Sequence, residues 1–175
     1  MTPMTERPAE VATHTVPGHW EGDLFKGARN GSAVGTLVER TTRLVLLARR
    51  EGTDARSARE GFTKKLRHVP ALLRKTLTYG WGKEMAEHER LAERLAIQIF
   101  FADPYSLWQR GTNENTNGLL RQYLPKGTDL SGYTQRELSA VADRPNTPPR
   151  TCLHFATPLE VDAHLHPHSP VARGT

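Results

Sequence analysis

The sequence has almost no cysteine and no long apolar segment. Cys152 is the single cysteine among 175 residues, which excludes a disulfide framework and a four-thiolate zinc site. No apolar run approaches the ~20 residues that cross a bilayer. The first residues, MTPMTERPAE, lack the apolar region of a signal peptide. Without internal repeats either, the chain is expected to be one soluble, cytoplasmic domain.

The charge balance is positive. Lys and Arg total 24 against 19 Asp and Glu, a net charge of +5, and hydrophobic residues make up 37% of the chain. That hydrophobic content is low but sufficient for one buried core. Clustered positive charge favours polyanionic partners, because phosphate contacts release counterions. The balance therefore favours nucleic acid over an acidic small substrate, although many basic proteins bind no nucleic acid.

The two ends of the chain differ from its middle. Residues 1–17 are rich in proline and polar side chains, so we expect a flexible lead-in before a domain at 18–162. Residues 163–175 have the same character and are expected to form a disordered tail. Its alternating histidines, at 164, 166 and 168, are compatible with metal binding, but Pro167 favours disorder.

Between the ends, the hydrophobic pattern changes from a period of 2 to a period of 3.6. Strands are predicted at 18–26, 33–40, 43–50, 75–79 and 97–102, and helices at 54–69, 83–95, 112–123 and 135–143. Asp54 is the expected cap of the first helix, and Pro70 follows its end. The first three strands predict an antiparallel meander. The whole order predicts a mixed α/β sheet covered by helices.

Two acidic residues stand out within this pattern. Asp23 lies on the first predicted strand, on the same face as Glu21, and Glu114 lies near the start of a later helix. Carboxylates from separate elements that meet at a sheet edge can hold Mg²⁺. Two such ions about 3.5–4 Å apart stabilise the attacking and leaving oxygens of phosphoryl transfer. By themselves, however, such residues are more often solvated surface groups.

Three longer motifs carry a family resemblance: GHWEGDL, KTLTYGWGKEMAEH and FADPYSLWQRGTNENTNGLLRQYLPKGTDLSGYTQREL. They resemble the catalytic core of the integrase-like DDE transposases of bacterial insertion sequences, most closely the family of insertion sequence thirty. The resemblance covers roughly His19 to Val161. It implies an RNase H-like fold, a five-stranded mixed sheet flanked by helices. It also implies metal-dependent DNA cleavage and strand transfer, with transposon ends and target DNA as partners.

The family uses three acids to bind two divalent ions, Mg²⁺ or Mn²⁺. The resemblance assigns the first to Asp23 and the third to Glu114, but the second position is Gly80. From Gly80 to Glu114 there are 114 − 80 − 1 = 33 intervening residues, a separation like that of the family. We therefore expect weakened metal binding and impaired catalysis. Glu84 is either a charge that favours a helix start or a substitute for the missing ligand.

Basic residues near these motifs are candidates for DNA contact. Lys64 and Lys65 lie together on the first long helix, where they form either a solvated face or a phosphate-binding face. Arg110, Arg121 and Lys126 flank the helix of Glu114, and DNA bound at the acidic residues has to cross that region. These three are the better candidates.

The chain also departs from the family in ways that favour a truncated, drifting remnant. The helix-turn-helix region that precedes this core in the family is not in the sequence. Pro145 is expected to break the last helix early, and Leu107 replaces the proline usual before WQ. The alternatives to an active transposase core are a non-catalytic nucleic-acid-binding module and an inactive remnant. Either could associate with a second copy, with an intact sister transposase, or with the bacterial nucleoid when on DNA.

Overall fold

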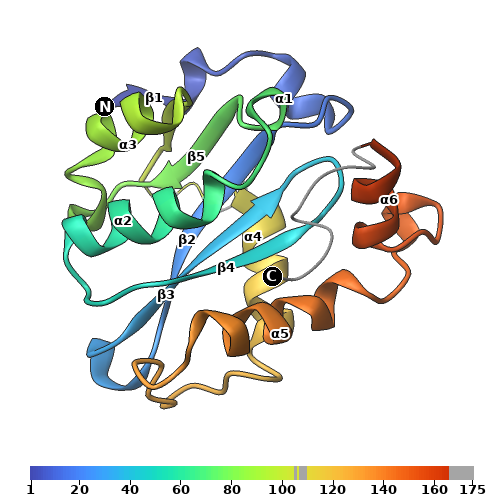
Figure 1. Ribbon diagram of the computed structural model, residues 1–175. Helices are drawn as coiled ribbons and strands as arrows, with labels where there is room; N and C mark the ends of the chain where they lie inside the picture. The colour runs from blue at the N-terminus through green and yellow to red at the C-terminus, as the bar shows by residue number, and fades with distance from the viewer. Residues whose placement is uncertain (105, 107–109, 166–175) are drawn as a thin grey trace.

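A computed structural model describes residues 1–104, 106 and 110–165, which form one twisted mixed sheet with helices on both faces (Figure 1). The strand order is β1-β6-β5-β2-β3-β4. The strands are β1 (Thr2–Pro3), β2 (His19–Lys26), β3 (Ala33–Glu39), β4 (Val45–Arg49), β5 (Thr76–Gly80) and β6 (Gln98–Ala102). The first long strand, β2, pairs antiparallel with β3 and parallel with β5, so it lies in the interior of the sheet.

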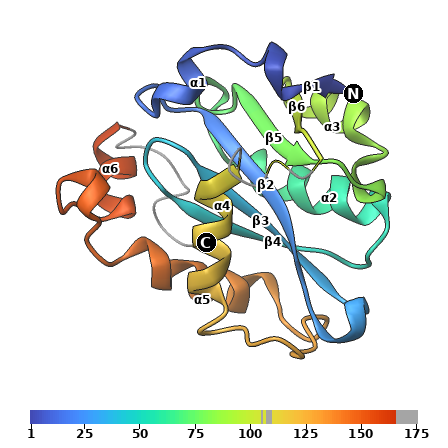
Figure 2. The same cartoon turned by 180° about the vertical axis from the view of Figure 1, so that it is seen from behind.

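Two pairs of helices cover the two faces of the sheet. The helices are α1 (Glu10–Thr13), α2 (Ala55–Leu66), α3 (His88–Leu95), α4 (Gly111–Leu120), α5 (Gln135–Asn146) and α6 (Pro158–Leu165). Helix α2 lies in front of the sheet in Figure 1, whereas α4 lies in front of it in Figure 2. We call the two sides the α2 face, which α3 also covers, and the α4 face, which α5 also covers. Helix α6 packs next to α5.

The two faces follow from the alternation of side chains along each strand. Trp20 of β2 packs in the hydrophobic cluster of the α2 face, with Phe62 of α2. Phe25, five residues later and therefore on the opposite side, packs in the cluster of the α4 face, with Leu120 of α4. Glu21 and Asp23 have the same parity as Phe25. Both acidic residues of β2 therefore belong to the α4 face.

The predicted mixed sheet is confirmed, but it has six strands rather than five. The additional strand, β1, belongs to the segment expected to be a flexible lead-in, and it pairs in parallel with β6. Arg7 donates a hydrogen bond to the Thr78 hydroxyl at 3.1 Å, and Val11 is buried. Backbone pairing and one long arginine side chain hold residues 2–13 against the core, so the expectation of an unstructured lead-in is corrected.

Two helix expectations also need correction. Pro145 does not end α5 early, because the helix runs to Asn146. The Asn146 amide is buried and makes two hydrogen bonds of 2.8 Å to the backbone of Val45, and this tertiary anchor holds the last turn. The helix expected from residue 83 begins only at His88, after a short 3₁₀ turn at Lys83–Met85.

Some expectations fall outside the described residues. Leu107 and the tail from residue 166 onward, with two of its three alternating histidines, belong to this group; residues 163–165 form the end of α6. Within the described part of the chain, none of the helices has the length and apolar character needed to span a membrane.

Two glycines offer a matched test of the packing. A Cβ on Gly35 of β3 would lie 2.6 Å from Cε1 of the buried Phe62 ring, whereas a Cβ on Gly118 of α4 would meet nothing within 4 Å. We expect Gly35→Ala to lower the free energy of unfolding by about 1–3 kcal/mol, since it overpacks the core. Gly118→Ala should raise it by about 0.5–1 kcal/mol, because alanine favours helix. Urea unfolding of both variants measures the difference. Equal effects of the same sign would contradict this packing.

Candidate active site

Asp23 lies on the α4 face, half-exposed beneath helix α4. Its Oδ2 accepts a hydrogen bond from the Asn117 side-chain amide at 3.1 Å. Its Oδ1 lies 3.4 Å from Nη1 of Arg110, which precedes the first turn of α4. Both carboxylate oxygens of the first expected metal ligand therefore have protein partners.

Gly80 lies beside Asp23 on the neighbouring parallel strand. Glu21 of β2 is paired in register with Thr78 of β5, and Asp23 and Gly80 each follow two residues later. A Cβ built on Gly80 would lie 3.1 Å from both Cζ and Nη1 of Arg110. The position expected for the second acid is therefore adjacent to the first acid, and a guanidinium covers it.

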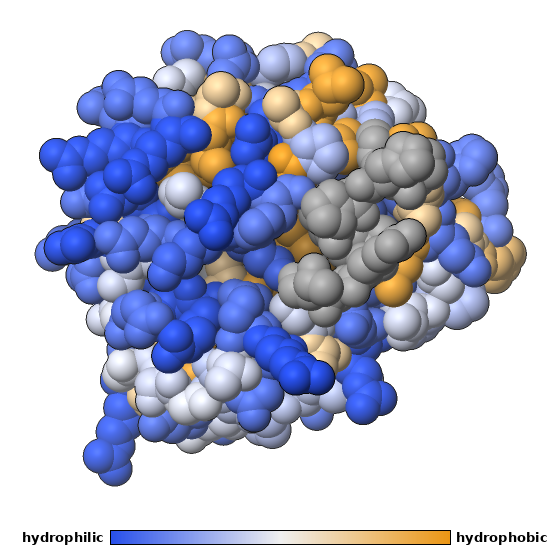
Figure 3. Space-filling model, in the orientation of Figure 1, coloured by the Kyte–Doolittle hydropathy of each residue, from blue (hydrophilic) through white to orange (hydrophobic). Residues whose placement is uncertain are grey.

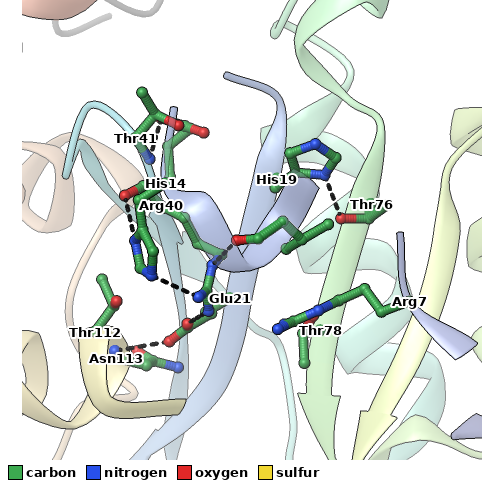
Figure 4. Close-up of polar contacts among 12 residues, drawn as sticks. Arg7, His14, His19, Glu21, Arg40, Thr41, Thr76, Thr78, Thr112 and Asn113 are labelled. Atoms are coloured by element: carbon green, nitrogen blue, oxygen red, sulfur yellow. Dashed lines mark hydrogen bonds and ion pairs between the residues drawn. The ribbon is translucent and has the colours of Figure 1, made fainter. Parts of the chain in front are cut away.

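Glu21 anchors the start of α4 to the sheet. Its carboxylate is fully buried, where Oε1 pairs with Arg40 and Oε2 accepts the backbone N–H of Asn113 at 2.9 Å (Figure 4). The Asn113 side chain adds a second tie, since its Oδ1 accepts from the Thr36 hydroxyl at 3.2 Å. These contacts fix the first turn of α4 against β2 and β3.

The charges around Glu21 form a wider network that reaches the N-terminal segment. Arg40 also donates to Nε2 of His14 at 2.7 Å, so that ring nitrogen is unprotonated in this arrangement (Figure 4). Burial, with Arg40 opposing it less strongly, raises the pKa of Glu21. Burial also lowers the pKa of His14. The free-energy cost of desolvating these groups is offset by their pairing with one another. Removing one member leaves its partner buried without a counter-charge and destabilises the fold.

Glu114 follows Asn113 and is exposed. It lies four residues after Arg110 and three before Asn117, both of which contact Asp23. Residues at such spacings share one side of a helix. Glu114 is therefore a neighbour of Asn117 on the surface of α4, and its convergence with Asp23 stays a prediction.

DDE transposases and integrases generally use divalent metals, but this donor set does not fit a two-ion centre. Within the described ranges, no group of three His, Cys, Asp or Glu residues is placed to hold a metal ion. Asp23 is engaged by an amide donor and a cation, and Gly80 supplies no oxygen from a side chain. A hard divalent ion needs several oxygen ligands with negative charge.

Glu84 lies in the 3₁₀ turn after β5, and its carboxylate folds back over Gly82. Tyr79, the residue before Gly80, interacts electrostatically with both Glu84 and Asp23. The role of Glu84 as a substitute for the missing ligand stays a prediction.

The candidate DNA-binding residues separate into two groups. Arg121 at the end of α4 stacks over the Phe25 ring at 3.8 Å, so it lies on the α4 face with Arg110, and Lys126 is exposed in the loop that follows α4. Lys64 and Lys65 belong to α2, and Lys65 donates a 3.4 Å hydrogen bond to the Ser139 hydroxyl of α5, so it lies at the β4 edge of the sheet, where α2 and α5 approach each other. The α2 face is mostly hydrophilic over α2 and α3, as expected for solvated helices (Figure 3).

Sequence reasoning noted Glu21 as a neighbour of Asp23 but did not assign its anchoring role. The sequence did carry a signal for this role: Glu21 alternates with Trp20 along a strand in the interior of the sheet, and a buried carboxylate there needs a buried partner. The partner, Arg40, is distant enough that no local spacing identifies it. The pairing of Arg110 with Asp23 was also missed, since Arg110 was expected to contact DNA.

In sequence, the chain is similar to curated insertion-sequence transposases. It is 57% identical over 159 residues to the transposase for insertion sequence element IS1086 of Cupriavidus metallidurans, covering 91% of this chain and 47% of that protein. It is 46% identical over 160 residues to transposase InsI for IS30A of Escherichia coli, covering 91% and 42%. It is 38% identical to the transposase for IS4351 of Bacteroides fragilis, covering 89% and 47%. The chain thus spans less than half the length of these relatives. No family model matches it.

A solved structure supports the fold. One chain of the simian T-cell lymphotropic virus intasome, determined in complex with PP2A regulatory subunit B56 gamma, matches with a TM-score of 0.57. The match covers 75% of this chain and 49% of that one at 20% identity. With the six-stranded mixed sheet, this likeness confirms the RNase H-like integrase-core fold.

The buried pair gives a stability prediction. Glu21→Gln keeps the size and an acceptor for the Asn113 N–H, but it leaves the Arg40 guanidinium buried without a counter-charge. We expect a loss of about 3–5 kcal/mol in the free energy of unfolding. The double variant Glu21→Gln, Arg40→Met should lose less than the sum of its single variants. Urea unfolding tests this, and a loss below about 0.5 kcal/mol, typical of an exposed pair, would show that Glu21 is not an anchor.

Proposed function

We propose that this chain is a fragment of an IS30-type insertion-sequence transposase, and that it is a DNA-binding core with an impaired catalytic centre. Its 46–57% identity to such transposases over 91% of its length supports the first part of this proposal. The observation that carries the second part is the pairing of Asp23 with Arg110 beside Gly80. The α4 face is the proposed side for DNA, with Arg121 and Lys126 as phosphate contacts.

The roles in the intact reaction follow the resemblance. Asp23 and Glu114 are the proposed acids of the centre, and a divalent metal pair would supply charge stabilisation for cleavage and strand transfer. Gly80 leaves that centre without its second carboxylate. In this chain Asp23 instead accepts a hydrogen bond from Asn117 and forms an ion pair with Arg110. The transposon ends and target DNA remain the proposed partners.

The second candidate is a non-catalytic nucleic-acid-binding module of the same fold, or an inactive remnant. It is favoured by the same Gly80, because a binding module needs the basic α4 face but no metal centre. Such a module would act on the nucleoid in the bacterial cytoplasm, alone, as an oligomer, or beside an intact sister transposase. Both candidates bind DNA and neither is expected to nick it, whereas only the first takes transposon ends as its specific partner.

DNA affinity is the first test. With a net charge of +5, the chain is expected to bind duplex DNA without sequence preference, and its logarithmic affinity should fall linearly with the logarithm of salt concentration. Lys126→Glu and Arg121→Glu should weaken binding, with Lys126→Glu reducing the salt slope by about 1. Lys64→Glu and Lys65→Glu measure any contribution of the α2 face. Fluorescence anisotropy measures all of these; no binding at low salt, or binding indifferent to salt, contradicts the proposal.

Nicking of supercoiled DNA is the second test. We expect the unaltered chain to show no nicking with Mg²⁺ or Mn²⁺ above that of its Asp23→Asn variant, because one of three carboxylates is missing. Agarose electrophoresis of plasmid DNA after incubation measures this. Metal-dependent nicking that Asp23→Asn abolishes would show that the centre is functional.

A further inference from the structure

The space that Gly80 leaves is filled by a cation. The Arg110 guanidinium is largely buried, with its side chain 18% exposed, and it contacts the two neighbouring strands at once. Nη1 lies 3.4 Å from Asp23 Oδ1, and Nη1 and Cζ lie 3.1 Å from where a Cβ on Gly80 would be. A side chain at position 80 would therefore have to displace Arg110 or contact it directly.

Arg110 occupies the position where positive charge is needed opposite Asp23. A guanidinium is a permanent cation that donates hydrogen bonds to carboxylates and accepts none. It satisfies the charge of Asp23, and the Asn117 amide satisfies the other oxygen at 3.1 Å. A divalent ion at the same place would lose its first ligand to Arg110 and would be repelled by it.

We propose that Arg110 is a built-in counter-cation of this site, which replaces the divalent metal and excludes it. The inference rests on the site put forward in the proposed function, and it specifies which cation pairs with Asp23 at that site. Two changes act together: Gly80 removes a metal ligand and, by having no side chain, makes room for the guanidinium. The centre is thus closed to metal by an ion pair and not only weakened by a missing oxygen.

The proposal predicts a different result from a site in which Gly80 merely leaves an empty space. If Gly80 left only a gap, Gly80→Asp would restore metal binding. With Arg110 in place, the new carboxylate lies within reach of the guanidinium and pairs with it, so little metal affinity returns. Restoration requires a second change, Arg110→Gln, which keeps an extended polar side chain but removes the charge.

Mn²⁺ calorimetry on the full chain tests this with five proteins. These are the unaltered chain, Gly80→Asp, Arg110→Gln, the double variant Gly80→Asp with Arg110→Gln, and Gly80→Asp with Arg136→Gln as a control. Arg136 is exposed on α5, so that control makes the same charge change away from Asp23. The double variant should bind Mn²⁺ at least tenfold more tightly than Gly80→Asp, and the control should match Gly80→Asp.

Two results would overturn the proposal. One is Gly80→Asp binding Mn²⁺ as tightly as the double variant; the other is Mn²⁺ binding by the unaltered chain that Asp23→Asn abolishes. Thermal unfolding checks that each variant is folded, and Arg110→Ala replaces Arg110→Gln if that variant is not. DNA anisotropy on the same proteins without metal judges the proposed function separately, because loss of DNA binding leaves the Mn²⁺ comparison intact.

Discussion

The buried carboxylate of Glu21 is the interaction on which the arrangement of the site depends. It is shared between the Arg40 guanidinium and the backbone N–H of Asn113, so it joins the central strand β2 to the first turn of α4. Helix α4 carries Glu114 and Asn117 and begins directly after Arg110, so the contact with Glu21 positions these three residues relative to Asp23.

Two acidic residues on the same face of β2 have different roles. Glu21 is fully buried and serves the fold, whereas Asp23, two residues later on the same face, is half-exposed at the surface of the site. The neighbouring strand β5 runs parallel and brings Gly80 beside Asp23. The absence of a single side chain there has a structural consequence, because Arg110 fills the space and neutralises the remaining carboxylate.

The sequence was sufficient for those parts of the fold that depend on local pattern. Period-2 runs predicted the five long strands, and the Asp54 cap marked the start of α2, where it accepts from the Ser57 N–H. The sixth strand has two residues and pairs through its backbone, so no side-chain pattern marks it. The last turn of α5 was missed for a similar reason, because the distant backbone of Val45 holds Asn146 in place.

The site was predictable only as far as the family motifs extend. They assign Asp23, Glu114 and the vacancy at Gly80, and those assignments stay predictions for the chemistry. What fills the vacancy depends on a side chain 30 residues further along, which only the packing of α4 brings back to β5. Pairings of this kind have no local sequence signal, because they are set by how helices cross the sheet.

The most direct test of this account is a crystal structure of the unaltered chain soaked in Mn²⁺, with anomalous scattering recorded to locate manganese. The account predicts no manganese peak at the Asp23 carboxylate, with the Arg110 guanidinium against Gly80 and Asn117 donating to Asp23. A pair of manganese ions bound by Asp23 and Glu114, with Arg110 turned away, would contradict it.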